Sequence, residues 1–409
     1  MSTLGLDGVL PWPQARHIAR TAARPLTGVP ARLDEAGGAL LCAPLVTIQD
    51  DPATDVAADD GYAVCGEGPW LLLDDLEVLT PGTACPLEAG APIPRHTDAV
   101  VPLLSGAVAA HPDGRSTLVA RDPLTGLPDE YERPTLGSGI VRQATVSAAG
   151  ATLVPMDAPV TPAVLALAAA SGRDEIDVIR TPVVGVLVLG NSLLDRGPPR
   201  HGRVRDALGY TVPAFVGQLG ARGNPAVRAP DTEELLLREI DDAAVDVLIT
   251  TGSTAPDPDN HLRRVLRDLD ARWLVDGVSV TPGAQMVLAR LQDGRFIIGL
   301  PGDPRAAMAA LVTLAAPLIG SLRGESPPTR ARSAVLVDDA PLADYVDDTC
   351  LVPVRVESSA AGTQARPILD AGPAGLQGWA TADAIAVVPP GAGVRGDVIE
   401  LLDPYGRAG

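Results

Sequence analysis

One stretch, Asp246–Asn260, constrains the fold of this chain more than any other. It reads D-V-L-I-T-T-G-S-T-A-P-D-P-D-N and runs directly into H-L-R-R-V-L-R-D-L. The short β-branched run Val247–Ile249 predicts a buried parallel strand, and the turn residues from Gly252 to Pro258 predict a loop. Asn260 is then placed to cap a helix whose N-terminal N–H groups and positive dipole end would face the loop and favour an anion. An ordinary surface loop rich in turn residues explains the same pattern equally well.

The remainder of residues 181–323 repeats this alternation of strand and helix. Apolar runs at Val183–Val188 and Arg295–Leu300 predict further buried strands. Helices are expected at Thr211–Leu219, Thr232–Ala243, Asn260–Leu269 and Pro304–Leu322. This order predicts a mostly parallel sheet with helices on both faces, in which ligands bind at the carboxyl ends of the strands. The strand-end loops Gly190–Arg205, Gly252–Asp259 and Pro301–Arg305 would then line one crevice.

Polar side chains in these loops suggest an anion and a divalent cation. Asp257 and Asp259 lie in the glycine loop, and a carboxylate beside a phosphate site favours a bridging hard cation. Gly302 permits close backbone approach, and Asp303 is placed to cap the helix that follows. The basic residues between positions 196 and 205 would either clamp a phosphate or carboxylate, or solvate an exposed loop in an acidic protein.

Two other parts of the chain consist of short apolar runs divided by Pro and Gly. Residues 70–142 predict a compact β-rich module, and residues 332–404 predict a small β-barrel or sandwich. Helices are expected at Pro11–Leu26 and Thr161–Ser171, the second with Thr161 as its cap. Asp60 precedes a short strand and would accept hydrogen bonds from a ligand or, more simply, from its own turn. His96 and Asp98 suggest a metal pair, although a single His in a Pro-rich loop is usually a solvated surface residue.

Composition argues against several classes of function. The 409 residues carry a formal net charge of −19, whereas a nucleic-acid interface or a contact with an anionic membrane needs a basic face. The chain contains no Lys, so every strong cationic contact must come from Arg. Four well-separated cysteines form no C-x-x-C pair, which predicts neither a zinc site nor disulfides and fits a reducing cytoplasm. Neither a signal-like segment nor a long uncharged span is found, so neither secretion nor membrane insertion is expected.

Six short motifs, in order and at matching spacing, resemble the molybdopterin molybdenumtransferase family, which includes MoeA and the gephyrin E domain. They are D-G-Y-A-V at Asp60–Val64, G-A-P-I-P with T-D-A-V-V at Gly90–Val101, G-R-V-R-D at Gly202–Asp206, T-G-S at Thr251–Ser253, T-P-G-A-Q at Thr281–Gln285 and G-L-P-G-D-P at Gly299–Pro304. The resemblance covers almost the whole chain. It implies an α/β multidomain fold of four parts: a helical linking domain from 1–50 plus 144–180, a β-rich domain from 51–143, a central parallel α/β molybdopterin-binding (MogA-like) domain from 181–323, and a small C-terminal β-barrel from 324–409.

The same resemblance implies a cytoplasmic homodimer that inserts molybdate into adenylated molybdopterin with release of AMP, assisted by Mg²⁺. A small-molecule pterin is the implied ligand, and other molybdenum-cofactor biosynthesis proteins are candidate partners. The implied roles are catalysis for Asp60, Asp98, Asp257 and Asp259; binding of the pterin and its phosphate for Gly252, Ser253, Thr254, Pro301, Gly302, Asp303, Arg203, Arg305 and Asp206; and metal binding for Asp257, Asp259 and Asp231. Asp60 and Asp98 would be contributed across the dimer.

The chain departs from the family motifs at several charged positions. The replacements are Asn191 and Ser192 for an acidic pair, Ala144-Thr145-Val146 for G-E-D, Thr281 and Ala284 for two lysines, and Asn260 for the aspartate that ends the glycine loop. Asp259 is adjacent to Asn260 and could substitute for it. Loss of preorganised charge would weaken catalysis more than binding. A catalytically weak protein that carries or senses molybdopterin or the finished cofactor is therefore an alternative, and a structural dimer with a vestigial crevice is another.

Overall fold

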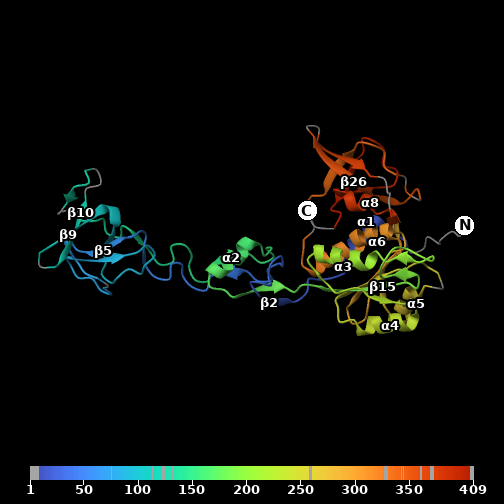
Figure 1. The fold of residues 1–409 in the computed structure, drawn as a ribbon, viewed down its shortest axis with the longest axis horizontal. Helices are drawn as coiled ribbons and strands as arrows, with labels where there is room; N and C mark the ends of the chain where they lie inside the picture. Colours follow the sequence, from blue (N-terminus) through green and yellow to red (C-terminus); the bar gives the residue numbers. More distant parts are fainter. Residues whose placement is uncertain are drawn as a thin grey trace. The chain divides into compact units, whose positions relative to one another are not determined.

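The computed structural model describes residues 9–74, 76–112, 114–121, 125–129, 133–257, 260–326, 330–341, 343, 345–359, 362–368 and 373–405. The chain divides into two compact units, each of which is described by itself (Figure 1). Unit 1 comprises Met1–Ala31, Gly38–Cys42 and Asp177–Gly409, and unit 2 comprises Arg32–Gly37 and Ala43–Ile176. The prediction of four domains is a finer division and stays a prediction.

Unit 1 contains a seven-stranded sheet in the order β18-β15-β20-β24-β23-β21, with β19 also paired to β15. The bounds are β15 Val183–Leu189, β18 Arg222–Gly223, β19 Val227–Ala229, β20 Val247–Thr251, β21 Arg272–Asp276, β23 Val287–Arg290 and β24 Phe296–Leu300. The three central strands are parallel, and all five residues of β20 are buried, as expected for a strand covered on both faces. The predicted parallel sheet is confirmed at its centre, but β23 runs antiparallel to both of its neighbours.

Asp246, the first residue of the Asp246–Asn260 stretch, holds β20 against β15. Its carboxylate accepts two hydrogen bonds from the Arg180 guanidinium, at 3.0 and 2.7 Å, and a third from the backbone N–H of Val183 at 2.8 Å. The hydrogen bond to Asp246 raises the pKa of Arg180, whose positive charge is thereby stabilised. Because Val183 begins β15, this cluster aligns the two strands at their amino ends.

Helices cover both faces of this sheet, as predicted. One face packs against α1 (Trp12–Thr21), α3 (Leu208–Gln218) and the helical run α6 (Pro304–Ala310), η2 (Leu311–Ala315) and α7 (Ala316–Leu322). The other face packs against α4 (Glu233–Asp242) and α5 (His261–Asp268). Figure 1 shows α3 and α6 on one side of β15, with α4 and α5 on the other. The two faces form separate aliphatic cores, in keeping with the low aromatic content of 3%.

The helical run Pro304–Leu322 is apolar because it lies in a core. Its length of 19 residues and mean hydropathy of 1.6 would suffice for a membrane span, but 78% of its most apolar window is buried within the protein. The middle of the run, η2, is a π-helical segment whose five residues are all buried. Burial among the sheet and its neighbouring helices therefore accounts for this composition.

The N-terminal helix α1 packs in unit 1. Its buried residues Trp12, Ala15 and Ala19 belong to the same core as α7, and the indole Nε1 of Trp12 donates to Thr313 Oγ1 at 2.9 Å. This differs from the predicted grouping of residues 1–50 with 144–180. The physical reason is that the apolar face of α1 contacts helix residues nearly 300 positions away, which local pattern does not reveal.

The C-terminal part of unit 1 forms a cyclic set of strand pairs. The strands are β25 (Arg332–Leu336), β26 (Thr349–Ser359), β27 (Gly362–Pro367), β28 (Ala384–Val388) and β29 (Val398–Leu402). The pairs β26–β27, β27–β25, β25–β29, β29–β28 and β28–β26 return to the starting strand, which is what closure of a barrel requires. Two further strands, β1 (Leu10–Pro11) and β22 (Val278–Thr281), extend this sheet through the β22–β26 pair. Helix α8 (Gln377–Thr381) precedes β28.

Unit 2 is mostly β-structure. Its larger sheet contains β5 (Gly61–Cys65), β6 (Trp70–Leu72), β7 (Thr83–Leu87), β8 (Ala99–Pro102), β9 (Gly106–Ala110), β10 (Ser116–Arg121) and β11 (Pro128–Asp129). Trp70 and Leu118 are fully buried in its core. The one α-helix among its described residues is α2 (Pro162–Ala170), where Thr161 Oγ1 accepts from the N–H of Val164 at 3.3 Å, as predicted for a cap. Four short two-stranded pairs complete the described strands. Unit 2 contains β3 (Leu45–Val46) with β13 (Thr152–Val154) and β4 (Val56–Ala57) with β12 (Ile140–Val141). Unit 1 contains β16 (Leu193–Leu194) with β17 (Val204–Arg205), and most residues of the pair β2 (Gly28–Arg32) with β14 (Glu175–Ile179) also belong to it.

Candidate functional site

The loops that follow β15, β20 and β24 come together at the carboxyl ends of these strands. The N–H of Gly252 donates to the carbonyl oxygen of Leu300 at 2.8 Å. A Cβ atom added at Gly252 would lie 3.3 Å from the carbonyl oxygen of Leu189, and one added at Gly302 would lie 3.8 Å from the Cα of Gly252. The structure therefore places the three predicted loops beside one another, with glycines where their backbones approach most closely.

The glycine loop adopts a left-handed conformation at two consecutive residues. Gly252 has φ +83° and Ser253 has φ +58°, which is uncommon for a residue with a side chain. Consecutive residues of this kind turn backbone N–H groups toward one side and can create an anion-binding concavity. Thr254 is 2% exposed, and its carbonyl oxygen accepts from Arg263 Nε at 2.8 Å. The loop is therefore fastened to α5 and its N–H groups are preorganised.

The sequence analysis predicted the wrong residue as the side-chain cap of α5. Asn260 occupies the position before the helix, but its side chain makes no capping hydrogen bond and instead donates through Nδ2 to the carbonyl oxygen of Ala255 at 3.0 Å. Ser253 Oγ accepts from the N–H of Leu262 at 3.4 Å in its place. The fold of the loop brings Ser253 to the helix N-terminus and turns Asn260 back into the loop, a competition between two nearby acceptors that spacing does not resolve.

Asp303 caps α6 as predicted. Its Oδ1 accepts from the N–H groups of Arg305 and Ala306, both at 3.0 Å. Arg305 Nε lies 3.6 Å from the same oxygen, and a Cβ added at Gly375 would lie 2.5 Å from Arg305 Cδ. The Arg305 side chain therefore lies against the C-terminal part of unit 1, which makes this part a second wall beside the Pro301–Arg305 loop.

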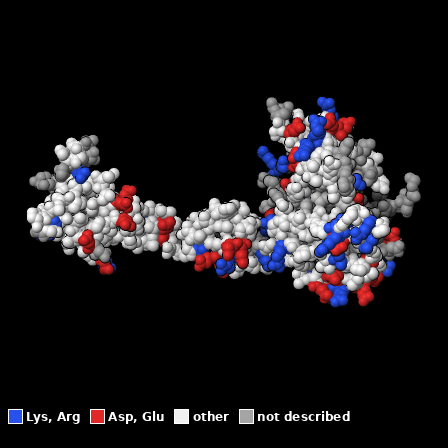
Figure 2. Space-filling view, viewed as in Figure 1, with Lys and Arg blue, Asp and Glu red and all other residues white. Residues whose placement is uncertain are grey.

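Asp206 and Arg203, both predicted to bind ligand, have protein partners. Asp206 is buried, and it accepts from the N–H of Gly209 at 2.9 Å and from Arg228 Nε at 2.8 Å. Arg203 is exposed and donates to the carbonyl oxygen of Leu193 at 2.7 Å. Asp206 thus secures the start of α3, while Arg203 belongs to a basic loop. Figure 2 shows arginine side chains gathered on the visible face of unit 1, in contrast with the acidic charge of the whole chain.

Asp231 provides the clearest position for a cation. Its backbone N–H donates to Asn191 Oδ1 at 3.2 Å, and its Oδ1 is buried without a hydrogen-bond partner in the described part of the chain. A buried carboxylate oxygen of this kind is costly unless a cation or donor satisfies it. Thr250 Oγ1 and His261 Nδ1 are likewise buried and unpartnered among the described residues. Both were missed by the sequence analysis, because an isolated Thr in a strand and a His at a helix start carry no motif.

These residues fit a Mg²⁺ ion bound jointly with a ligand. The described residues contain no group of three or more His, Cys, Asp or Glu side chains that could hold a metal by themselves. Mg²⁺, however, usually takes only one or two carboxylates together with substrate phosphates and waters. Asp231 has the unsatisfied oxygen, Asp257 is exposed in the glycine loop, and Asp259 lies outside the described residues.

Asp60 and Asp98 lie in unit 2, at opposite ends of one strand pair. Asp60 precedes β5 and Asp98 precedes β8, and the register of these antiparallel strands pairs Gly61 with Pro102 and Val64 with Ala99. Asp98 is thus level with Cys65, five residue steps from Asp60, or roughly 17 Å along the strands. Asp60 Oδ1 accepts from the N–H of Ala89 at 2.8 Å, and Asp98 Oδ2 from that of Gly66 at 2.7 Å. The structure does not bring them to one point. Among the described residues, no third His, Cys, Asp or Glu joins His96 and Asp98 in a group that could hold a metal.

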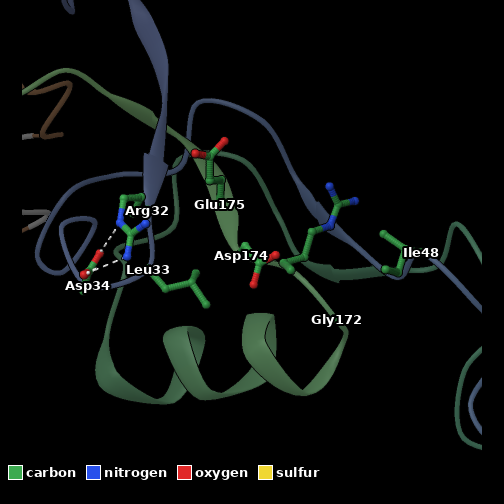
Figure 3. A pocket seen from close by; sticks show the side chains of 8 residues that line it. Arg32, Leu33, Asp34, Ile48, Gly172, Asp174 and Glu175 are labelled. Atoms are coloured by element: carbon green, nitrogen blue, oxygen red, sulfur yellow. Dashed lines mark hydrogen bonds and ion pairs between the residues drawn. The ribbon is translucent and has the colours of Figure 1, made fainter.

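Unit 2 also contains an open cavity of about 830 Å³ that the sequence did not predict (Figure 3). Its walls carry both signs of charge, with Arg32 paired to Asp34 on one side and Asp174 and Glu175 on β14 and the segment before it. The hydrogen bond from Arg32 lowers the pKa of Asp34, so this carboxylate stays charged at neutral pH. Because acidic and basic side chains both line the cavity, its charge favours no single class of ligand.

Two family models match successive parts of the chain. Residues 10–172 match the model of the MoeA N-terminal region (domain I and II), and residues 185–321 match that of a probable molybdopterin binding domain. Molybdopterin molybdenumtransferase 2 of Mycobacterium tuberculosis is 30% identical over 341 residues, covering 77% of this chain and 80% of that protein. Molybdopterin molybdenumtransferase of Bacillus subtilis is 28% identical over 267 residues, covering 64% of this chain and 59% of that protein.

Solved structures show the same fold. Two structures of the molybdopterin biosynthesis MoeA protein from Pyrococcus horikoshii superpose with TM-scores of 0.73 and 0.62, at 21% and 18% sequence identity. Each comparison covers 96% of this chain, and 98% and 99% of the respective archaeal chains. The likeness extends over nearly the entire length of both proteins, so the archaeal chains contain the folds of both units in the same order along the sequence.

Proposed function

Since the chain belongs to the molybdopterin molybdenumtransferase family, we propose that it acts in molybdenum cofactor biosynthesis by inserting molybdate into adenylated molybdopterin with release of AMP. The observation that supports this most directly is the convergence of three strand-end loops on the left-handed segment Gly252-Ser253. The unsatisfied oxygen of Asp231 adds to it, because Asp231 is hydrogen-bonded to Asn191 in the first of these loops. Backbone donors, a helix N-terminus and a free carboxylate oxygen are the groups that a phosphate with its divalent cation requires.

The residues of the crevice divide by role. The N–H groups of Gly252, Ser253 and Thr254, and those of the Gly302–Asp303 segment, would hold the pterin and its phosphate. Arg305, after the Gly302–Asp303 segment, and Arg203, in the loop that follows β15, would supply positive charge. Asp231 with Asp257 and Asp259 would hold Mg²⁺, which when bound neutralises phosphate charge. Asp206 would act indirectly, because its carboxylate is already engaged by Gly209 and Arg228.

In this proposal the crevice stays functional although several acidic residues of the family motifs are replaced. Asn191, at one of these positions, contacts Asp231 directly, because its side-chain oxygen accepts a hydrogen bond from the backbone N–H of Asp231. Its amide orients Asp231 without adding a second charge beside the cation. The carrier or sensor alternative has no comparable observation in its favour, and the assay below separates it from the transferase.

A cytoplasmic homodimer completes the proposal, with Asp60 and Asp98 supplied to the crevice by the second copy. Leu104 is 91% exposed and its neighbour Leu103 is 52% exposed, directly after β8 of unit 2. Two adjacent leucines exposed to this degree are compatible with a protein contact surface. Other molybdenum-cofactor biosynthesis proteins remain candidate partners.

The direct test mixes purified full-length protein with adenylated molybdopterin, molybdate and Mg²⁺ and follows AMP release together with formation of active cofactor. Both products are expected. Tight binding of the pterin without AMP release would instead establish a carrier or sensor, and a chain that neither binds nor converts would be left with a structural role only.

Replacing Asp231 with Asn tests the proposed cation position. We expect turnover at saturating substrate to fall by roughly 10²–10³-fold, the usual cost of removing one preorganised electrostatic group. Asp242→Asn is the matched control, because Asp242 ends α4, the helix that begins just after Asp231, and its side chain is 74% exposed. The double variant Asp257→Ala with Asp259→Ala should lose Mg²⁺-dependent turnover while remaining folded. Unaltered Mg²⁺ dependence in both variants would remove these carboxylates from the metal site.

A further inference from the structure

Residues 195–205, which run from the end of β16 through β17, form a positively charged loop in unit 1. This positive loop contains four arginines and one aspartate, Asp195, whereas the whole chain has a net charge of −19. Arg196, Arg200 and Arg203 are exposed and Arg205 is half-buried. Within the described part of the chain, none of the four has a carboxylate partner. The loop therefore carries uncompensated positive charge on an acidic protein.

The base of the positive loop is fastened to α3 and to β19. Arg205 donates to the carbonyl oxygen of Leu194 at 3.1 Å and to the hydroxyl of Tyr210 at 2.8 Å. The guanidinium carbons of Arg205 and Arg228 lie 5.1 and 5.6 Å from the centre of the Tyr210 ring. The charge of Arg228 is balanced by Asp206 at 2.7 Å. Hydrogen bonds and ring contacts thus order the base of the loop without cancelling its charge.

A tight turn forms the tip of the positive loop. Arg200 and Arg203 each donate their backbone N–H to the carbonyl oxygen of the other, at 3.2 and 3.0 Å. The two residues between them, His201 and Gly202, have φ values of +52° and +72°, as in a type I′ turn. Like charges on directly opposite residues repel, and a left-handed His is uncommon. The turn therefore holds positive charge in a fixed place at a cost in stability.

The tip of the loop lies close to the candidate site. In the β16–β17 register Val204 pairs with Leu193, two residues after Asn191, whose side chain contacts Asp231. From the spacing of paired strands and of consecutive Cα atoms, the Cα of Arg200 lies at most about 15 Å from that of Leu193. The Debye length is about 30 Å at 0.01 M ionic strength and about 8 Å at 0.15 M. The field of the tip therefore reaches the crevice at low ionic strength and is largely screened at the higher value.

An anion that approaches the crevice is repelled by most of the protein. The net charge of the chain is −19, and the candidate site itself includes the acidic residues Asp231, Asp257 and Asp303. Both substrates of the proposed reaction, molybdate and a phosphate-bearing pterin, are anions. Positive charge beside a site of this kind raises the association rate constant of an anion by roughly 10- to 10³-fold. The exposed tip of the positive loop supplies such charge where the overall field is unfavourable.

We propose that Arg196 and Arg200 steer the anionic substrate to the crevice through their long-range field, and that neither contacts the substrate once it is bound. The identity of the anion rests on the proposed function. The two arginines act on association, whereas Arg203 and Arg305 belong to the crevice itself. A steering residue of this kind changes the association rate constant and its dependence on salt, and has little effect on dissociation.

Stopped-flow mixing of the full-length protein with adenylated molybdopterin, followed by pterin fluorescence, measures the association and dissociation rate constants separately. In the double variant Arg196→Gln with Arg200→Gln, the association rate constant at about 0.01 M ionic strength should fall about tenfold. The dissociation rate constant should change by less than about twofold. At about 0.15 M ionic strength the association rate constants of the variant and the wild type should converge, because salt screens the field that the variant lacks.

The matched control is Arg222→Gln with Arg290→Gln, which removes the same two charges from the opposite end of the sheet. Arg222 pairs with Val183, the first residue of β15, and Arg290 pairs with Phe296, the first residue of β24; both arginines are exposed. This control should associate with the pterin like the wild type. An equal fall in both double variants would make the net charge of the chain responsible and overturn the proposal. Faster dissociation with unchanged association in the loop variant would also overturn it, because the arginines would then contact the bound substrate.

Failure of the proposed function gives a different result from failure of the steering proposal. If association depends on Arg196 and Arg200 but no AMP is released, the steering stands and the transferase reaction is wrong. If AMP is released while the loop variant associates like the wild type, the transferase stands and the steering is wrong. A wild-type protein that binds no adenylated molybdopterin contradicts both.

Discussion

Single residues of the candidate site take their orientation from partners in neighbouring loops. Asp303 and Thr161 cap their helices as their sequence positions predict, since the side chain of each accepts from N–H groups two or three residues ahead. Asn260 does not cap, because Ser253 reaches the same helix end from the other side of its loop. Likewise, Asn191 looks like a lost carboxylate in the sequence but holds the backbone of Asp231 in the structure. Such choices depend on which atoms the fold brings within hydrogen-bond distance.

Asp55 gives unit 2 a predictable response to acid. Hydrogen bonds from the N–H of Gln143 at 2.8 Å and then from the Arg142 guanidinium at 2.6 Å lower the pKa of this carboxyl. An Asp whose pKa is lowered by folding stabilises the protein above its unfolded value of about 3.9, and this contribution is lost as the pH falls through the lower folded value. Asp55→Asn should therefore lower the melting temperature at pH 6, with the difference from wild type shrinking progressively as the pH falls below about 4.

The comparison is made by thermal denaturation of both proteins between pH 2.5 and pH 7. Asp59→Asn serves as the control, because Asp59 is an exposed carboxyl in the same unit. A difference between Asp55→Asn and wild type that stayed constant across this range would show that the two hydrogen bonds do not stabilise the charged form.

Helices and strands show where local pattern is sufficient. The strand β20 and the run α6–η2–α7 fall close to their predicted bounds, since each is a long or strongly apolar segment. Helix α3 begins at Leu208, three residues before the predicted Thr211, and includes Pro213 in its second turn. Proline at this position has no N–H to donate to the carbonyl oxygen of Gly209, so α3 lacks one intrahelical hydrogen bond there. The earlier start is supported by Asp206, whose Oδ1 accepts from the N–H of Gly209.

The cap of α6 can be tested by substitution. Asp303→Ala removes the acceptor of two N–H groups at the end of a buried helix and should lower the free energy of unfolding by about 1 kcal/mol. Asp303→Asn keeps a side-chain oxygen and should lose only a small part of this. Urea denaturation followed by circular dichroism measures both. If the two variants were destabilised equally, the charge of Asp303, rather than its capping hydrogen bonds, would be the stabilising feature.

On the scale of the whole molecule, each unit has its own hydrophobic core. The cores of unit 1 lie on the two faces of the α/β sheet and inside the C-terminal strand cycle, whereas that of unit 2 surrounds Trp70 and Leu118. Separate cores predict that damage to one unit does not propagate fully to the other. The four tryptophans of the sequence allow a direct measurement, because Trp12, Trp273 and Trp379 belong to unit 1 and only Trp70 belongs to unit 2.

Trp70→Ala and Trp70→Phe both leave fluorescence to unit 1 alone. The alanine variant should lose about 3–5 kcal/mol of unit 2 stability through the cavity it creates, and the phenylalanine variant less. We therefore expect the circular-dichroism signal of unit 2 to unfold at lower urea in Trp70→Ala, with the fluorescence midpoint the same in both variants. A matching shift of the fluorescence midpoint would mean that the two units unfold as one.

The sequence by itself determined the α/β alternation of residues 181–323, the β-rich character of two further parts, the helix caps at Thr161 and Asp303, and the family through six short motifs. These follow from hydrophobic period, turn residues and local spacing, which act over a few residues. Only the tertiary structure decided that α1 packs in the α/β core, that Asn191 orients Asp231, and that Asp60 and Asp98 lie roughly 17 Å apart along their strands. Each depends on contacts between residues distant in sequence, whose energies arise only when the chain has packed.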